Sequence, residues 1–126
     1  MKLKIKNEVY DFEATFGFYR EMNATVKTHV DSMNKDENIG ASYMLTKLIN
    51  RDIETLTDIL LLLNKNQKPS LKRADLEEYV ATEADIDELF NGVIDFLSQS
   101  NMTKNVMGQV KKENERQKKL AEKMIM

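Results

Sequence analysis

The stretch IGASYMLTKLINRDIETLTDILLLLN, residues 39–64, decides the fold. Its apolar residues recur at steps of four, three, four and three, which is the spacing of one face of a helix: Ile49, Ile53, Leu56, Leu60 and Leu63. A membrane span needs roughly 20 predominantly apolar residues, whereas five charged side chains interrupt this stretch. The sequence therefore predicts the buried centre of a small helical core.

This central segment is expected to break once. Asn50 tolerates the left-handed conformation in which many helices end, and Asp52 is a good N-cap for a second helix. A continuous helix is the alternative, since no residue at this point forbids one.

The N-terminus predicts a β-hairpin. Apolar side chains alternate with charged ones on both sides of a turn at Asn7-Glu8, which places four of them on one face: Leu3, Ile5, Tyr10 and Phe12. An isolated hairpin is marginal in water, so this face must cover helices or pair with another chain. Alternation of this kind is typical of a strand and not of a signal peptide, so we expect an intracellular, soluble protein.

A first helix is expected after this hairpin, capped by Thr15. Apolar residues follow at steps of four, at Phe18, Met22, Val26 and Val30, and the polar residues 32–38 would close the helix with a loop. His29, the single histidine, is interpreted as a surface or core-edge residue and not as a metal ligand.

Two more helices are predicted in the second half of the chain. Pro69 marks a turn, after which Ser70 can cap a short helix through Val80. Asp85 and Glu88 have the spacing of a capping box. They open the cleanest amphipathic helix of the sequence, with these apolar residues: Ile86, Leu89, Phe90, Val93, Ile94 and Leu97.

The apolar pattern decays after residue 101. Residues 111–119 contain no apolar side chain, although good helix formers dominate, so we expect a helix that is stable with a partner and frays without one. The fold class is mainly α with a small N-terminal β-hairpin (α+β). It divides into a compact hairpin-plus-helix domain, residues 1–101, and a basic C-terminal helical tail, residues 102–126.

Charge is segregated between these two parts. Residues 74–103 contain eight Asp and Glu but no Lys or Arg, whereas residues 103–126 contain seven Lys and Arg and three Glu. These are either two solvated surfaces that happen to differ, or a tail that folds back on the acidic helices or is offered to a partner. A small regulatory or nucleic-acid-associated protein that uses the basic tail is the alternative function. The acidic body and the lack of aromatic residues after Phe96 count against it.

Catalytic signals are missing. The chain has no cysteine, one histidine and four scattered glycines, so it offers no thiolate metal site, no nucleophile with its base and no phosphate-binding loop. We expect no enzyme, no cofactor and no metal.

Three features occur together in a characteristic order. A Lys-rich strand pair ends at Tyr10-Asp11-Phe12 and leads into FGFYREMN, residues 16–23. DIETLTDIL, residues 52–60, opens the second half of the core. PSL, residues 69–71, then leads to LEEYV, residues 76–80, and IDELF, residues 86–90. This arrangement, from residue 1 to about residue 100, resembles the tail assembly chaperones of long-tailed phages and prophages of Gram-positive bacteria.

The resemblance implies a chaperone in the host cytoplasm, absent from the mature virion, that coats the tape-measure protein while the tail tube assembles. It also implies a longer form, made by ribosomal frameshifting, that recruits tube subunits. We expect a homo-oligomer, associating through the hairpin edge or the tail, that binds neither nucleic acid nor membrane. A structural tail component is a further alternative.

Partner binding requires an exposed apolar groove. Ten residues are the candidate partner-binding set: Leu56, Leu60, Leu63, Val93, Ile94, Leu97, Met102, Met107, Lys111 and Lys112. The competing interpretation is that most of these leucines are plain core and that only the terminal methionines and the tail are free.

Overall fold

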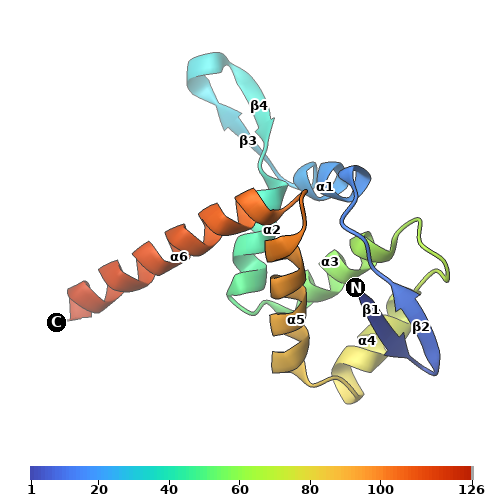
Figure 1. The fold of residues 1–126 in the computed structure, drawn as a ribbon. Coiled ribbons are helices and arrows are strands. Elements are labelled where there is room, and N and C mark those ends of the chain that lie inside the picture. Colours follow the sequence, from blue (N-terminus) through green and yellow to red (C-terminus); the bar gives the residue numbers. More distant parts are fainter. Residues whose placement is uncertain (126) are drawn as a thin grey trace.

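The computed structural model describes residues 1–125, and within them the chain forms six α-helices and two separate two-stranded sheets (Figure 1). The helices are α1 (Phe16–Asn23), α2 (Gly40–Ile49), α3 (Ile53–Asn64), α4 (Arg73–Thr82), α5 (Ile86–Gln99) and α6 (Lys104–Ile125). The strands are β1 (Lys2–Ile5), β2 (Glu8–Asp11), β3 (Lys27–Val30) and β4 (Lys35–Asn38), and a 3-10 turn, η1 (Asp31–Met33), joins the last two. The expected class, mainly α with an N-terminal hairpin, is confirmed. None of these helices is long and apolar enough to cross a membrane.

The β1–β2 hairpin forms as predicted, but its turn lies one residue earlier. Ile5 pairs with Glu8, so Lys6 and Asn7 are the turn residues, with φ of 51° and 66°. Two-residue turns with both φ values positive match the twist of the flanking strands. One face of the hairpin is buried against the helices, with Ile5 0% and Tyr10 8% exposed.

The second hairpin contradicts the sequence prediction. Thr15 caps α1 as expected, accepting a bond of 3.1 Å from the Phe18 backbone N–H, but α1 ends at Asn23. Residues expected to continue this helix form β3, and residues expected to be a loop form β4. The step-of-four spacing of Val26 and Val30 was misleading, because Val26, Thr28 and Val30 also alternate at strand spacing and are β-branched.

The central segment breaks where predicted. The left-handed residue is Arg51, with φ 66°, and not Asn50 as expected, which has φ −84°. The Asp52 carboxylate caps α3 as predicted, accepting a 3.1 Å bond from the Thr55 backbone N–H. The continuous helix is thereby excluded. The Arg51 guanidinium lies 5.2 Å from the centre of the Phe90 ring and donates to Asn91 Oδ1 at 2.7 Å, so the break is fastened to α5.

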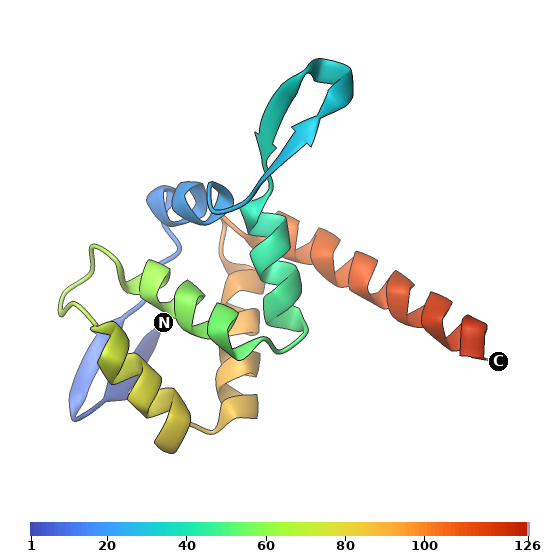
Figure 2. The ribbon, with the colours of Figure 1, turned by 180° about the vertical axis from the view of Figure 1, so that it is seen from behind.

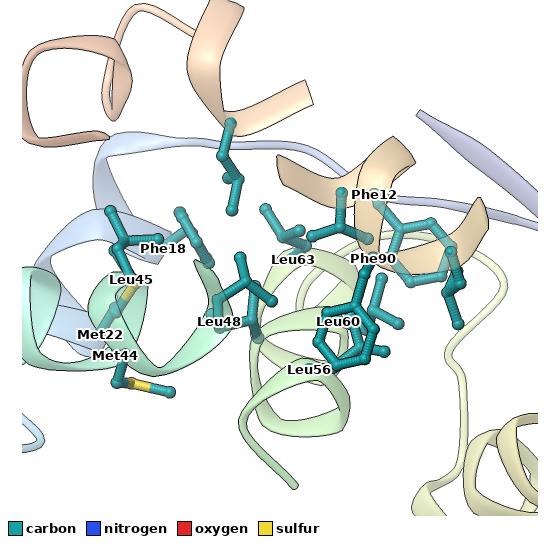
Figure 3. Close-up of a cluster of buried hydrophobic side chains, with 14 of the residues drawn as sticks. Phe12, Phe18, Met22, Met44, Leu45, Leu48, Leu56, Leu60, Leu63 and Phe90 are labelled. Carbon is teal, nitrogen blue, oxygen red and sulfur yellow. The ribbon is translucent and has the colours of Figure 1, made fainter. Parts of the chain in front are cut away.

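A single hydrophobic core joins α2, α3 and α5 with the first hairpin and α1 (Figure 3). Fully buried side chains include Phe12, Leu48, Leu60 and Phe90. Gly40 opens α2 in close contact with α1, since a Cβ there would lie 2.1 Å from the Met22 carbonyl oxygen. No larger residue fits at this crossing.

Asn64 ties the core to the chain around it. Its amide donates to the carbonyls of Asp11 (3.0 Å) and Pro69 (3.2 Å), and its oxygen accepts from the Leu71 N–H at 2.7 Å. The side chain is 2% exposed, so these bonds satisfy polar groups that water does not reach.

The two predicted caps in the second half have different outcomes. Asp85 caps α5 as expected, accepting from the Glu88 N–H at 3.1 Å. Ser70 does not cap α4, because that helix starts later, after Lys72, without a side-chain cap.

The tail is a long helix with two distinct parts. Met107 and Val110 of α6 are buried against α2 and α5, so the compact core extends past residue 101, where the sequence had placed the start of the tail. Beyond Val110 the helix projects away from the body (Figure 2). At about 1.5 Å per residue, residues 111–125 extend about 22 Å.

Candidate protein-binding groove

The ten predicted partner-binding residues fall into two groups. Six belong to the core and are 0% exposed: Leu56, Leu60, Leu63, Val93, Leu97 and Met107. Ile94 and Met102 are half-buried, and Lys111 and Lys112 are exposed on α6. A partner would reach the first group only if the helices separated, so partner binding through these six residues stays a prediction that requires opening of the core.

The structure instead brings other apolar side chains to the surface, in a groove of about 430 Å³. We call it the α2–α3 groove. Its lining comes from both helices, from the start of α4 and from the segment between α1 and β3: Thr25, Val26, Tyr43, Met44, Lys47, Thr55, Asp58, Leu61, Leu62, Lys65 and Arg73. None of these residues belongs to the ten that the sequence predicted as a partner-binding site.

The helical geometry of α3 explains why leucines line the groove. Leu60 and Leu63 point into the core, which leaves Leu61 and Leu62 half-buried on the flank of the same helix. Tyr43 faces them from α2 and is 48% exposed. The run of leucines in the sequence was the available signal, because one face of a helix cannot bury four consecutive residues.

The rim of the groove carries three cations, each with a carboxylate nearby. Lys47 lies 3.7 Å from Asp52, Lys65 lies 2.6 Å from Glu21, and Arg73 lies 3.2 Å from Asp58. All three pairs are exposed, and exposed ion pairs contribute little to stability. These cations can therefore exchange their present carboxylates for those of a partner at small cost.

Two further contacts shape the rim. The Lys47 ammonium lies 5.5 Å from the centre of the Tyr43 ring, which holds both side chains at the edge of the groove. Hydrogen bonds from Thr55 hold the pKa of the Asp52 carboxyl below its usual value. Asp52 therefore keeps its charge, as helix cap and as the counter-charge of Lys47, to a lower pH than an ordinary aspartate.

The apolar surface continues along the outer side of α2. A second hollow, of about 390 Å³, shares Tyr43 and Lys47 with the groove and adds Ile39, Ser42 and Thr46. An elongated apolar surface with a polar rim suits an amphipathic helix laid along it.

The exposed part of α6 carries a separate basic surface, formed by Lys111, Lys112, Glu115, Arg116 and Lys119. Lys111 donates to Ser98 Oγ at 2.6 Å, and Arg116 pairs with Glu113 at 2.7 Å. The hydrogen bond from Arg116, followed by one from Gln117, lowers the pKa of Glu113 to about 2.

Within residues 1–125, no group of three or more His, Cys, Asp or Glu is placed to hold a metal ion. His29 lies exposed on the second hairpin, with Nδ1 3.0 Å from Asp36. The predicted surface location of this residue is confirmed.

A small helical body with an apolar surface groove and a projecting helix is typical of a protein-binding module. Comparison with known families assigns it further. Residues 2–112 match the family described as phage tail assembly chaperone protein, TAC, so the chain belongs to this family. The match confirms the resemblance and extends it into α6. No curated protein and no solved structure matches the chain.

Membership of a chaperone family indicates a non-enzymatic role and binding to phage tail proteins.

Proposed function

We propose that this chaperone binds the tape-measure protein and keeps it soluble while the tail tube assembles. The observation that carries this proposal is the α2–α3 groove, which leaves Tyr43, Leu61 and Leu62 open to solvent at the surface of the core. A tape-measure protein is long, largely helical and apolar, so it aggregates unless small multi-copy proteins cover it. Apolar segments of such a helix match the groove in chemistry.

The electrostatics of the groove support a mainly apolar partner segment. The three rim cations are already balanced by three carboxylates, so the groove offers no strong net field to a charged ligand. Many successive segments of a long helix could therefore bind in the same way. Buried apolar area would supply most of the affinity.

The proposal includes a second, longer form. A frameshifted product would continue from α6, which projects from the body on a side distinct from β1, β2 and α4 (Figures 1 and 2). An extension there would recruit tube subunits while the body holds the tape measure. Such a protein would act in the host cytoplasm and be absent from the mature virion.

The direct test is co-expression with a tape-measure fragment, scored by the amount of soluble fragment and by co-purification. Tyr43→Glu should lower both at least tenfold, because it places a charge in the apolar lining. Ile53→Glu is the matched control, since Ile53 is 46% exposed, almost the same as Tyr43, but lies outside the groove. Equal binding by both variants, or equal loss, would contradict the assignment of the groove.

The nucleic-acid alternative rests on the cations clustered on α6. Gel retardation of DNA at moderate salt separates the two functions, because phosphate binding by this helix would shift the DNA and tape-measure binding would not. We expect no shift. Detection of the chain in purified virions would instead favour the structural tail component.

A further inference from the structure

A second groove, of about 330 Å³, lies between β1, α4 and α5, and we call it the acidic groove. Met1, Leu3 and Tyr79 provide apolar walls, and Asp85 and Glu88 provide its charge. Within residues 1–125 neither carboxylate has a cation in ion-pair distance: residues 74–103 contain no Lys or Arg, and Lys2 and Lys6 of the first hairpin pair with other carboxylates. The groove is thus apolar with a net negative charge, because its two carboxylates outnumber the Met1 ammonium, which donates to the Phe12 carbonyl at 3.0 Å.

Gly92 forms part of the lining of this groove, on α5. A glycine in a helix interior is destabilising relative to alanine. Nothing within this chain requires it, since a Cβ at Gly92 would meet no atom within 4 Å. A helix from another molecule could approach the α5 backbone closely here.

The complementary surface lies at the far end of α6, in residues 118–125, which we call the tail tip. Leu120, Met124 and Ile125 are 43%, 86% and 86% exposed, unusually open for apolar residues. On a helix they share one side with Ala121, and lysines flank that side: Lys118, Lys119 and Lys123. None of these lysines forms an ion pair within residues 1–125.

The tail tip cannot reach the acidic groove of its own chain. The groove lies beside β1 and α4, whereas α6 leaves the body in the opposite direction in both views (Figures 1 and 2). The buried Met107 and Val110 fix that direction. Any contact between the two surfaces must therefore be made between copies.

We infer that the acidic groove of one copy binds the tail tip of a second copy, so that the molecules associate head to tail. The contact places an apolar helix side between Met1, Leu3 and Tyr79, and flanking lysines beside Asp85 and Glu88. Because the two surfaces differ, the association is heterologous and yields rings or open chains and not a closed symmetric dimer. The head-to-tail contact does not use the α2–α3 groove, so that groove remains free.

Two variants of the full-length protein test this arrangement. The groove variant Glu88→Lys/Gly92→Arg reverses a charge and fills the space above α5. The tail variant Lys123→Glu/Met124→Glu makes the tail tip acidic. The matched control Glu77→Lys reverses an exposed carboxylate of the same acidic segment that lines a different surface, and Gly92→Ala tests the change in helix propensity alone.

Light scattering over a range of concentrations gives the readout. The wild type and Glu77→Lys should grow beyond a dimer as concentration rises, and each double variant should remain monomeric on its own. A one-to-one mixture of the double variants should associate, because each variant supplies the intact surface that the other lacks. Association of the wild type should weaken at least tenfold between roughly 0.1 and 1 M salt, as screening shortens the range of the charges.

A monomeric wild type, a closed wild-type dimer, double variants that assemble normally, or a mixture that does not pair would each overturn the inference. Thermal unfolding of each variant checks that it is folded. If either double variant unfolds, Glu88→Lys and Lys123→Glu alone replace the pairs and are judged by the same outcomes.

Discussion

The two hairpins of this chaperone have the same four-residue strands and opposite relations to the core. The β1–β2 hairpin buries Ile5 and Tyr10 and is fixed to α3 by a bond from the Glu13 N–H to the Leu63 carbonyl, 3.0 Å long. The β3–β4 hairpin has no buried residue and projects from the body (Figure 1). Burial holds the first hairpin in place, whereas only cross-strand bonds and turn residues hold the second.

The difference shows that a β-hairpin can form either with one face buried or with both faces exposed. In the first hairpin, alternation in the sequence coincides with an inner and an outer face. In the second, both faces meet water, so hydrophobic alternation carries little information about it. Stability should therefore be distributed unequally between the two.

Hydrogen exchange should reveal the largest difference. We expect inter-strand amides of β1–β2 to exchange only with an opening free energy close to that of global unfolding, typically about 5–15 kcal/mol. The inter-strand amides of β3–β4 should exchange through local opening, with an opening free energy that is a small fraction of that value. Equal protection in both hairpins would show that the second one is not an independent unit.

Core truncation should give the next largest effect. Ile5→Ala removes a fully buried side chain, so the free energy of unfolding should fall by about 2–5 kcal/mol in urea titrations. Val30→Ala, the matched change in the second hairpin, should stay within about 0.5 kcal/mol of the wild type. A large loss for Val30→Ala would indicate that the projecting hairpin packs on something in solution.

Asn64→Ala should destabilise the attachment of the first hairpin by about 1–3 kcal/mol, because it leaves buried carbonyls and one buried N–H without partners. Thermal unfolding provides the measurement. Asn38→Ala is the control at the base of the second hairpin, where the residue is exposed and the change should be near zero.

The smallest effect concerns the outer turn of the first hairpin. Lys6 Nζ lies 2.7 Å from Glu78 and 3.0 Å from Asp75, and these bonds, with Glu78 first, raise the pKa of Lys6 above its usual 10.5. A raised pKa means that the contribution is present below pH 10.5 and is lost as the pH rises further. Lys6→Met should thus be slightly less stable at pH 7, with the difference from wild type shrinking above pH 10.5.

Lys4→Met changes an exposed lysine of β1, in the same hairpin, and should show neither change. If the two substitutions behaved alike, the pairing of Lys6 with α4 would contribute nothing.

The sequence predicted the structure most accurately where a local rule, such as helix capping, and the spacing of buried residues indicated the same element. The caps at Thr15, Asp52 and Asp85 and the amphipathic helix after Asp85 all formed as predicted, because capping chemistry and apolar spacing point to the same residues. The second hairpin was missed because Val26 and Val30 also fit a helix, and no burial pattern decided between the two.

The candidate site was less predictable for a related reason. Apolar spacing identifies what a helix buries, so Leu56, Leu60 and Leu63 were selected and proved to be core. The groove uses residues on the flanks of that spacing, such as Tyr43 and Leu61, and their exposure depends on how far apart α2 and α3 are set. That separation is set by tertiary packing, and the hydrophobic pattern of either helix alone does not predict it.

The closed base of the second hairpin gives the molecule a convenient attachment point. The Ile39 N–H bonds to the Val26 carbonyl at 2.9 Å, so the chain leaves the body and returns at nearly the same place. For the rest of the molecule, residues 27–38 therefore act as a short link between α1 and α2 that contributes no buried side chain. The chain contains no cysteine, and Ser32 is exposed in η1 at the outer end of this link. Ser32→Cys would thus provide one unique thiol for a dye or an affinity tag, away from the core.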